Sequence, residues 1–138
     1  MSVGRYDGTS VYAPTVGVFV IGGCDGDNWI TTVNHLCSTG NSDDSQDDEN
    51  KLGWSWSEAE PLLFPCELPL GAYLRERIYV CDGAWNANTL QSANVSTEGG
   101  LQWSSLEFKR PVGNRALATS LVFHGNNMLL SCELCVYL

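Results

Sequence analysis

The segment GVFVIGG, residues 17–23, is a short apolar run that ends on two glycines. Runs of the same kind return twice later in the chain, as RIYVCDG at 77–83 and NMLLSCE at 127–133. Alignment of the three runs places Val18 on Ile78 and on Met128, with spacings of 60 and 50 residues. Glycine at the end of a strand lets the backbone turn where a Cβ would clash or φ must be positive. The sequence therefore predicts a unit of about fifty residues that recurs along the chain.

Residues that flank the apolar runs indicate the same unit. Arg5 lies 13 residues before Val18, and Arg115 lies 13 residues before Met128. Downstream, the first two units align in three pairs, which are Ile30 with Leu90, Thr32 with Ser92 and Asn34 with Asn94. Each of these units then reaches a tryptophan, which is Trp54 or Trp56 in the first and Trp103 in the second. The first tryptophan comes late because an acidic insertion, residues 41–51, precedes it.

The segments between these positions favour strands over helices. Most are short, β-branched or aromatic, and bounded by Gly, Asn, Asp or Pro. The stretches APTVG (13–17) and HGNN (124–127) are typical of tight hairpin connections. We predict strands near 8–13, 17–22, 32–37, 54–58, 69–74, 77–82, 90–96, 101–106, 117–123 and 127–132. The predicted fold class is therefore all-β.

These units resemble the kelch-repeat family. The resemblance rests on VFVIGG (18–23), on WSWSEAEP and QWSSLEFKRP with their tryptophans, and on Arg5 and Arg115 before first strands. It covers nearly the whole chain, with departures. Asp82-Gly83 and Cys132-Glu133 replace the double glycine in the later units, and Pro65 stands where the second arginine would fall. The resemblance implies a β-propeller in which each unit is one four-stranded blade.

On this resemblance we expect a partial kelch-type β-propeller. Its two antiparallel blades would span about 5–58 and 65–106, and the opening hairpin of a third would span about 115–132. The structural residues would be Gly22, Gly23 and Gly83 at strand ends, and Trp54, Trp56 and Trp103 buried between blades. Propellers close with about 4–8 blades. The chain would therefore be a fragment of a longer protein, or several copies would assemble, and its open blade faces favour self-association.

Binding is expected at one end of the blades, where the loops between second and third strands meet the connections between blades. The predicted binding residues there are Arg5, Asp27, Trp29, Trp85, Asn86 and Arg115. Tryptophan beside adaptable polar residues suits a protein-binding surface, although packing over the blade edge explains it equally well. The resemblance implies that the two arginines point to a central opening and grip acidic partner groups. The alternative is that they form bridges between blades.

Composition and charge argue against a nucleic-acid partner and against a metal site. The formal net charge is −9, and no basic stripe is present, so a nucleic-acid partner is not expected. Residues 41–51 are acidic and polar without apolar partners, which predicts a solvated, dispensable loop. Calcium binding is the alternative, but the spacing of an EF-hand site is missing. CELC at 132–135 is either half of a metal site or part of an apolar strand, and with no second half-site we expect no metal and no cofactor.

The sequence also bears on localisation. No apolar run is long enough to span a bilayer, so no membrane contact is expected. The segment MSVGRYDGTS at the N-terminus lacks the pattern of a signal peptide, which predicts a cytoplasmic chain with six reduced cysteines.

Two functional hypotheses remain. The first is a protein-protein interaction module, a fragment of a kelch-like adaptor. The resemblance implies substrate recognition for a cullin-type ubiquitin ligase or actin binding, although no helical BTB region is present in this chain. The second is a fragment of a kelch-propeller enzyme, an oxidase or a carbohydrate-active protein. No catalytic motif or convergent ligand set supports the second hypothesis, so the prediction is a non-enzymatic binding module.

Overall fold

The computed structural model describes residues 4–39, 53–83, 89–97, 100–107, 118–125, 127–132 and 136–137. Every regular element in these ranges is a β-strand. It follows that this part of the chain contains no helix able to cross a membrane. The predicted acidic loop at 41–51 lies outside the described residues.

The first eight strands form two antiparallel sheets, each in the order of the sequence. The first sheet contains β1 (Thr9–Ala13), β2 (Gly17–Ile21), β3 (Val33–Thr39) and β4 (Gly53–Ala59). The second contains β5 (Leu70–Leu74), β6 (Arg77–Cys81), β7 (Thr89–Val95) and β8 (Leu101–Glu107). All eight predicted strands agree with these bounds to within two residues. Short apolar runs between turn residues were thus a sufficient signal for the strands.

A third, three-stranded sheet follows, in the order β11-β10-β9. It contains β9 (Ala118–His124), β10 (Asn127–Cys132) and β11 (Val136–Tyr137). The predicted β9–β10 hairpin is confirmed. β11 was not predicted, because it pairs with β10 through only two residues, too few to leave a pattern. For the described residues, the prediction of two four-stranded antiparallel sheets and a further hairpin in an all-β chain is confirmed.

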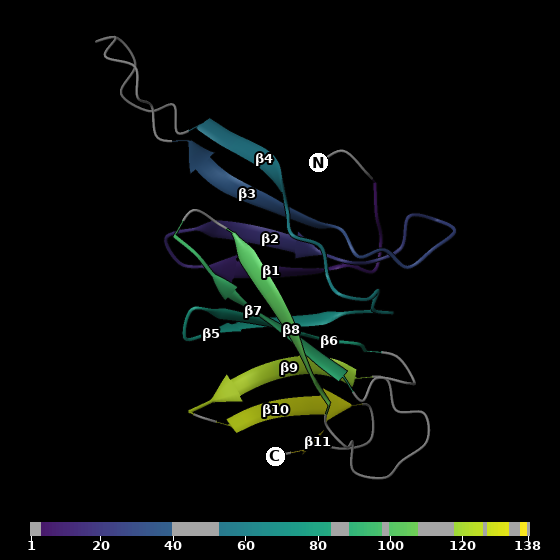
Figure 1. The fold of residues 1–138 in the computed structure, drawn as a ribbon. Helices are drawn as coiled ribbons and strands as arrows, with labels where there is room; N and C mark the ends of the chain where they lie inside the picture. The colour runs from purple at the N-terminus through teal and green to yellow at the C-terminus, as the bar shows by residue number, and fades with distance from the viewer. Residues whose placement is uncertain are drawn as a thin grey trace, which may run out of the picture.

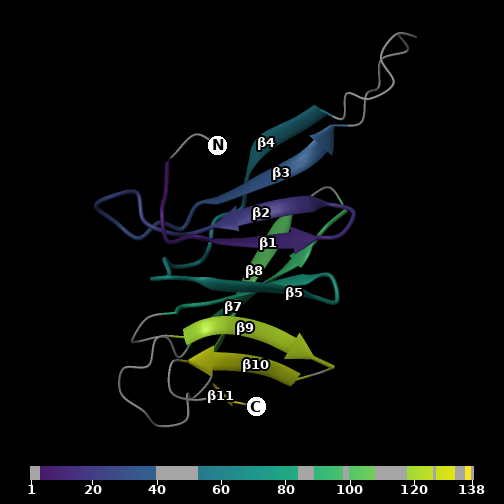
Figure 2. The ribbon, with the colours of Figure 1, turned by 180° about the vertical axis from the view of Figure 1, so that it is seen from behind.

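The three sheets are stacked through their first strands. Figures 1 and 2 both show β1 beside β5 and β5 beside β9. At the first junction, the amide nitrogen of Gly71 on β5 donates a hydrogen bond to Thr9 Oγ1 on β1, at 3.2 Å. The arrangement is open rather than closed into a barrel, and it is consistent with partial blades.

The main hydrophobic core lies between the first and second sheets. It takes Val11, Ala13, Phe19, Ile21 and Val33 from the first sheet, and Ile78, Val80, Ala93 and Leu101 from the second. A smaller cluster of Cys81, Leu90 and Leu121 joins the second sheet to the third. Because neighbouring residues of a strand point to opposite faces, Val80 and Cys81 belong to different clusters. The second sheet is therefore covered on both of its faces.

Glycines shape the point where the second strand of each four-stranded sheet ends. Gly22 and Gly23 have φ values of 61° and 98°, which side-chain-bearing residues rarely adopt. A Cβ on Gly83 would lie 2.2 Å from the carbonyl oxygen of Leu68. The three glycines therefore occupy the structural positions that the sequence predicted, the first two for their dihedral angle and the third for a close approach.

The two four-stranded sheets share one row of cross-strand neighbours. In the first sheet the row is Tyr12, Val18, Leu36 and Trp56. In the second it is Tyr73, Ile78, Ala93 and Trp103. Both rows run from a tyrosine on the first strand to a tryptophan on the fourth. In each sheet the row lies on the face that points away from the following sheet, which we call the rear face.

The tryptophans of the two rows differ in burial. Trp103 is half-buried against the main core, and its indole Nε1 donates to the carbonyl oxygen of Glu60 at 2.9 Å. Trp54 and Trp56 are 61% and 42% exposed. No described residue forms a sheet in front of the first one, so the expectation that these two fill a space between blades stays a prediction.

The connection from β4 to β5 is held by one side chain of the second sheet. Gln91 is fully buried. Its Oε1 accepts from the amide nitrogen of Leu63 at 2.8 Å, and its Nε2 donates to the carbonyl oxygen of Phe64 at 3.0 Å and to Cys66 Sγ at 3.2 Å. Burial raises the pKa of the Cys66 thiol to about 12, so this sulfur stays protonated. The amide thereby fixes the chain just before it enters β5.

Candidate functional site

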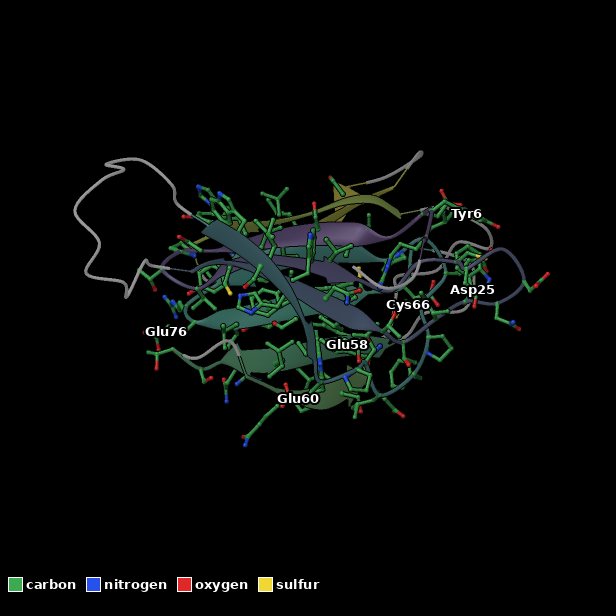
Figure 3. The ribbon with its side chains drawn as sticks, turned by 90° about the horizontal axis from the view of Figure 1, so that it is seen from above. Tyr6, Asp25, Glu58, Glu60, Cys66 and Glu76 are labelled. Atoms are coloured by element: carbon green, nitrogen blue, oxygen red, sulfur yellow. The ribbon has the colours of Figure 1, made fainter. Side chains whose placement is uncertain are left out.

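The predicted binding residues of the first sheet lie at one end of the molecule. Antiparallel pairing places the segment before β1, the β2–β3 loop and the segment after β4 at the same end. Figure 3 shows Tyr6, Asp25 and Cys66 gathered there, while Glu76, in the β5–β6 turn, lies at the opposite end. We call the first two of these segments, residues 4–8 before β1 and 22–32 between β2 and β3, the loop end.

Backbone pairing ties the two segments of the loop end together. Tyr6 and Cys24 exchange two hydrogen bonds, of 3.1 and 2.9 Å, and form an isolated bridge. Cys24 forms a second bridge with Trp29. Trp29 is half-buried, which fits neither a fully exposed anchor nor a core residue. The two segments of the loop end are therefore fixed to each other by backbone hydrogen bonds.

The loop from Asp25 to Asn28 closes on itself. One carboxylate oxygen of Asp25 accepts hydrogen bonds from the amide nitrogens of Asp27 and Asn28, at 3.2 and 3.0 Å. These bonds stabilise the ionised form and lower the pKa of Asp25. Such local pairing of an aspartate with the next backbone amides is a common way to fix a turn. It leaves the side chain of Asp27 exposed to solvent.

The guanidinium of Arg5 is engaged within its own sheet. One of its terminal nitrogens donates to the carbonyl oxygens of Gly22 and Thr32, at 3.0 and 2.8 Å. The other donates to Asn34 Oδ1. Desolvation lowers the pKa of Arg5, and its Nε is buried with no hydrogen-bond partner among the described residues. The geometry shows Arg5 bracing the chain that enters β1 against the end of β2 and the start of β3.

Two hollows lie on the rear face of the first sheet. One, of about 330 Å³, is lined by residues 5–10 together with Val20 and Trp56. The other, of about 230 Å³, is lined by residues 15–18 with Tyr12, Ser38 and Trp54. Each hollow has a tryptophan of β4 as one wall. The first of them continues the loop end onto the rear face through Arg5 and Tyr6.

Half of the predicted binding residues can be placed. Arg5, Asp27 and Trp29 all lie at the loop end, whereas Trp85, Asn86 and Arg115 fall outside the described residues. The sequence reading missed Tyr6, which is 54% exposed beside Arg5. It also missed Asp25, although the pattern Asp-Gly-Asp-Asn at 25–28 is a turn signal that could have indicated it.

Among the described residues, no group of three or more His, Cys, Asp or Glu side chains is placed to hold a metal ion. The described residues do place carboxylates at the loop end, where Asp7, Asp25 and Asp27 are all exposed. Together with Tyr6 and Trp29, these groups give an acidic and aromatic surface. Comparison of the chain with protein-family models and with curated proteins finds no match.

Proposed function

We propose that the chain is part of a kelch-type β-propeller that binds a protein partner through the loop end. The observation that carries the proposal is the stack of four-stranded sheets with adjoining first strands, each with the same tyrosine-to-tryptophan row. Packed blades of this kind hold their loops at fixed positions, and loops on a rigid scaffold are common binding sites.

The chemistry of the loop end suggests the kind of partner surface. The guanidinium of Arg5 already has three acceptors within the sheet. The exposed carboxylates of Asp7 and Asp27 have no such internal use in the described structure, and Tyr6 adds aromatic surface. A partner with basic and amide groups would complement this surface. The proposed role is that of a cytoplasmic adaptor which brings a protein to an assembly, as do the kelch-repeat proteins that recognise substrates for cullin-type ubiquitin ligases or bind actin, which this chain resembles.

The test compares two substitutions that change charge by the same amount at opposite ends. Asp27→Lys alters the loop end, and Glu76→Lys alters the β5–β6 turn. After affinity capture from cells with the tagged protein, we expect proteins retained by the wild type and by Glu76→Lys to be lost with Asp27→Lys. Equal retention by both variants would reject the loop end as the binding surface.

The predicted residues outside the described ranges provide a second test. In a closed parent protein, Trp85→Ala and Arg115→Ala should each weaken binding of a captured partner by more than about 1 kcal/mol, as interface anchors do. Titration calorimetry measures the affinity, and a thermal melt of the same variant controls for folding. A lower melting temperature with unchanged affinity would assign Arg115 to a bridge between blades.

A further inference from the structure

The rear face of the first sheet is apolar and uncovered in the described structure. Its row carries Tyr12 and Trp56, which are 65% and 42% exposed, and Trp54 beside the row is 61% exposed. Single exposed apolar side chains are ordinary, but several on one sheet face with two hollows between them mark an interaction surface.

The same positions of the second sheet are covered. Val18 and Val20 on the first sheet correspond to Ile78 and Val80, both of which are fully buried under the first sheet. Tyr12 corresponds to Tyr73, which packs against the main core. The uncovered face thus has the composition of a face that another sheet covers.

The other end of the stack carries the matching half of this junction. On β9, Leu121 belongs to the cluster against the second sheet, and the ring of Phe123 contacts that of Tyr79 in a tilted arrangement with the centroids 4.9 Å apart. Val122 lies between them, so it points to the opposite face, where it is 52% exposed and pairs with Leu129. The corresponding pair in the first sheet is Val11 and Phe19, which are buried against the second sheet.

We propose that a second copy of the chain covers the rear face of the first sheet with the outer face of its β9–β10 hairpin. Each copy carries both halves of the junction, and the contact repeats the one that already exists between successive sheets within the chain. Such a head-to-tail interface closes into a ring when the rotation allows it. Two copies bring together six sheets of the described kind, within the usual range of about 4–8 for propellers.

This inference rests on the blade arrangement of the proposed function and not on the loop end. Its test uses the full chain in solution and two separate variants, each of which places a charge on one half of the junction. Trp56→Glu disrupts the rear face, and Val122→Glu disrupts the outer face of the hairpin. Leu63→Glu is the matched control, because Leu63 is 54% exposed but lies in the β4–β5 connection, away from both faces.

Mass measured by light scattering after size exclusion should correspond to two chains for the wild type and for Leu63→Glu. Each junction variant alone should elute as one chain, with a dissociation constant raised roughly tenfold or more. Circular dichroism confirms that both variants fold, and Tyr12→Lys replaces Trp56→Glu if that variant does not. A mixture of the two junction variants should again form two-chain complexes, since one of its two junctions is intact.

Three results would overturn the proposal. A wild-type chain that stays monomeric rejects association with a second copy. That result leaves the proposed loop-end binding intact, because the capture experiment with Asp27→Lys tests it separately. Dissociation by Trp56→Glu but not by Val122→Glu means that two rear faces meet each other. Failure of the mixed variants to associate excludes the head-to-tail contact.

Discussion

The rear faces of the first and second sheets carry the same row of residues in different surroundings. Tyr73 and Trp103 pack against the main core, whereas Tyr12 and Trp56 are 65% and 42% exposed. Their strands are paired in the same way, since Tyr12 lies opposite Val18 and Tyr73 lies opposite Ile78, each on an antiparallel second strand. The comparison shows that the pattern of a strand fixes which face it offers, while burial depends on whether another sheet lies in front of that face.

The third strands of the two sheets each carry a buried amide side chain at the same position, but the two amides have different hydrogen-bond partners. Asn34 lies opposite Val20 in the first sheet, and Gln91 lies opposite Val80 in the second. Both amides are buried, at 3% and 0% exposure. Asn34 Oδ1 accepts a hydrogen bond from the guanidinium of Arg5. Gln91 accepts one from the amide nitrogen of Leu63 and donates to the carbonyl oxygen of Phe64 and to Cys66 Sγ. In each sheet the amide on the third strand fixes the segment that leads into the first strand.

The largest expected difference concerns the two tryptophans of the rows. Trp103→Ala should lower the free energy of unfolding by about 3 kcal/mol, because it opens a cavity at the junction and leaves the Glu60 carbonyl without its donor. Trp56→Ala should cost about 1 kcal/mol, since the side chain is 42% exposed and no described sheet lies in front of it. Urea titration provides both values, at a protein concentration low enough to dissociate any assembly. Equal losses would show that the two faces are not in different surroundings.

The two buried amides should differ next. Gln91→Ala leaves the amide nitrogen of Leu63 and the carbonyl of Phe64 unpaired, and we expect a loss of about 2 kcal/mol. Asn34→Ala removes one of three acceptors of Arg5, so the loss should be about 1 kcal/mol. The measurement is the urea midpoint, with the exposed Ser105, opposite Gln91 on β8, changed to alanine as the control. A smaller loss for Gln91→Ala than for Asn34→Ala would contradict the comparison.

Arg5 provides a test of its role as a brace. Arg5→Ala should lower stability by about 1–2 kcal/mol, because two carbonyl oxygens and one amide lose a charged donor. Arg5→Lys should recover only part of the loss, since an ammonium does not reproduce the geometry of the guanidinium. Thermal unfolding measures stability, and capture of partners measures binding. Loss of binding with no loss of stability would instead support a direct contact with the partner.

The smallest effect is one of pH. Burial raises the pKa of Cys66 to about 12, so in the folded chain the thiol stays neutral where the unfolded chain already ionises. The contribution is present below the ordinary thiol pKa and is lost as pH rises from there towards about 12, because ionisation favours the unfolded state. Between pH 8 and pH 10 we expect a loss of about 1 kcal/mol that Cys66→Ala does not show. Parallel pH profiles of the two proteins would refute this.

The strands and their pairing could be predicted because each apolar run is short and ends in a turn residue. The alignment of the second and third strands was less accurate. It matched Asn34 with Asn94, whereas the register makes Gln91 its counterpart. The reason is that the connection from Ile21 to its partner Val33 is three residues longer than that from Cys81 to Leu90. Loop length varies without changing the sheet, so an alignment by sequence across a loop shifts.

At the loop end, position could be predicted but the use of side chains could not. Arg5, Asp27 and Trp29 were expected at one end because antiparallel topology requires it. That Arg5 is tied to Gly22 and Thr32 depends on where two carbonyl oxygens point, which no sequence pattern records. The exposure of Trp54 and Trp56 depends on what lies in front of the sheet. Both features arise from three-dimensional context.

The buried amide also bears on how such units can be detected in a sequence. Pro65 has no guanidinium, yet three hydrogen bonds of Gln91 hold the segment around it. Gln91 is one methylene longer than Asn34 and reaches the backbone of residues 63 and 64 and the Cys66 thiol. A four-stranded sheet of this kind can therefore have no arginine before its first strand and still fix the entry into that strand. A search pattern that requires arginine would pass over the second unit. One that requires an amide opposite the fourth residue of the preceding strand, which is Val20 in β2 and Val80 in β6, would find both.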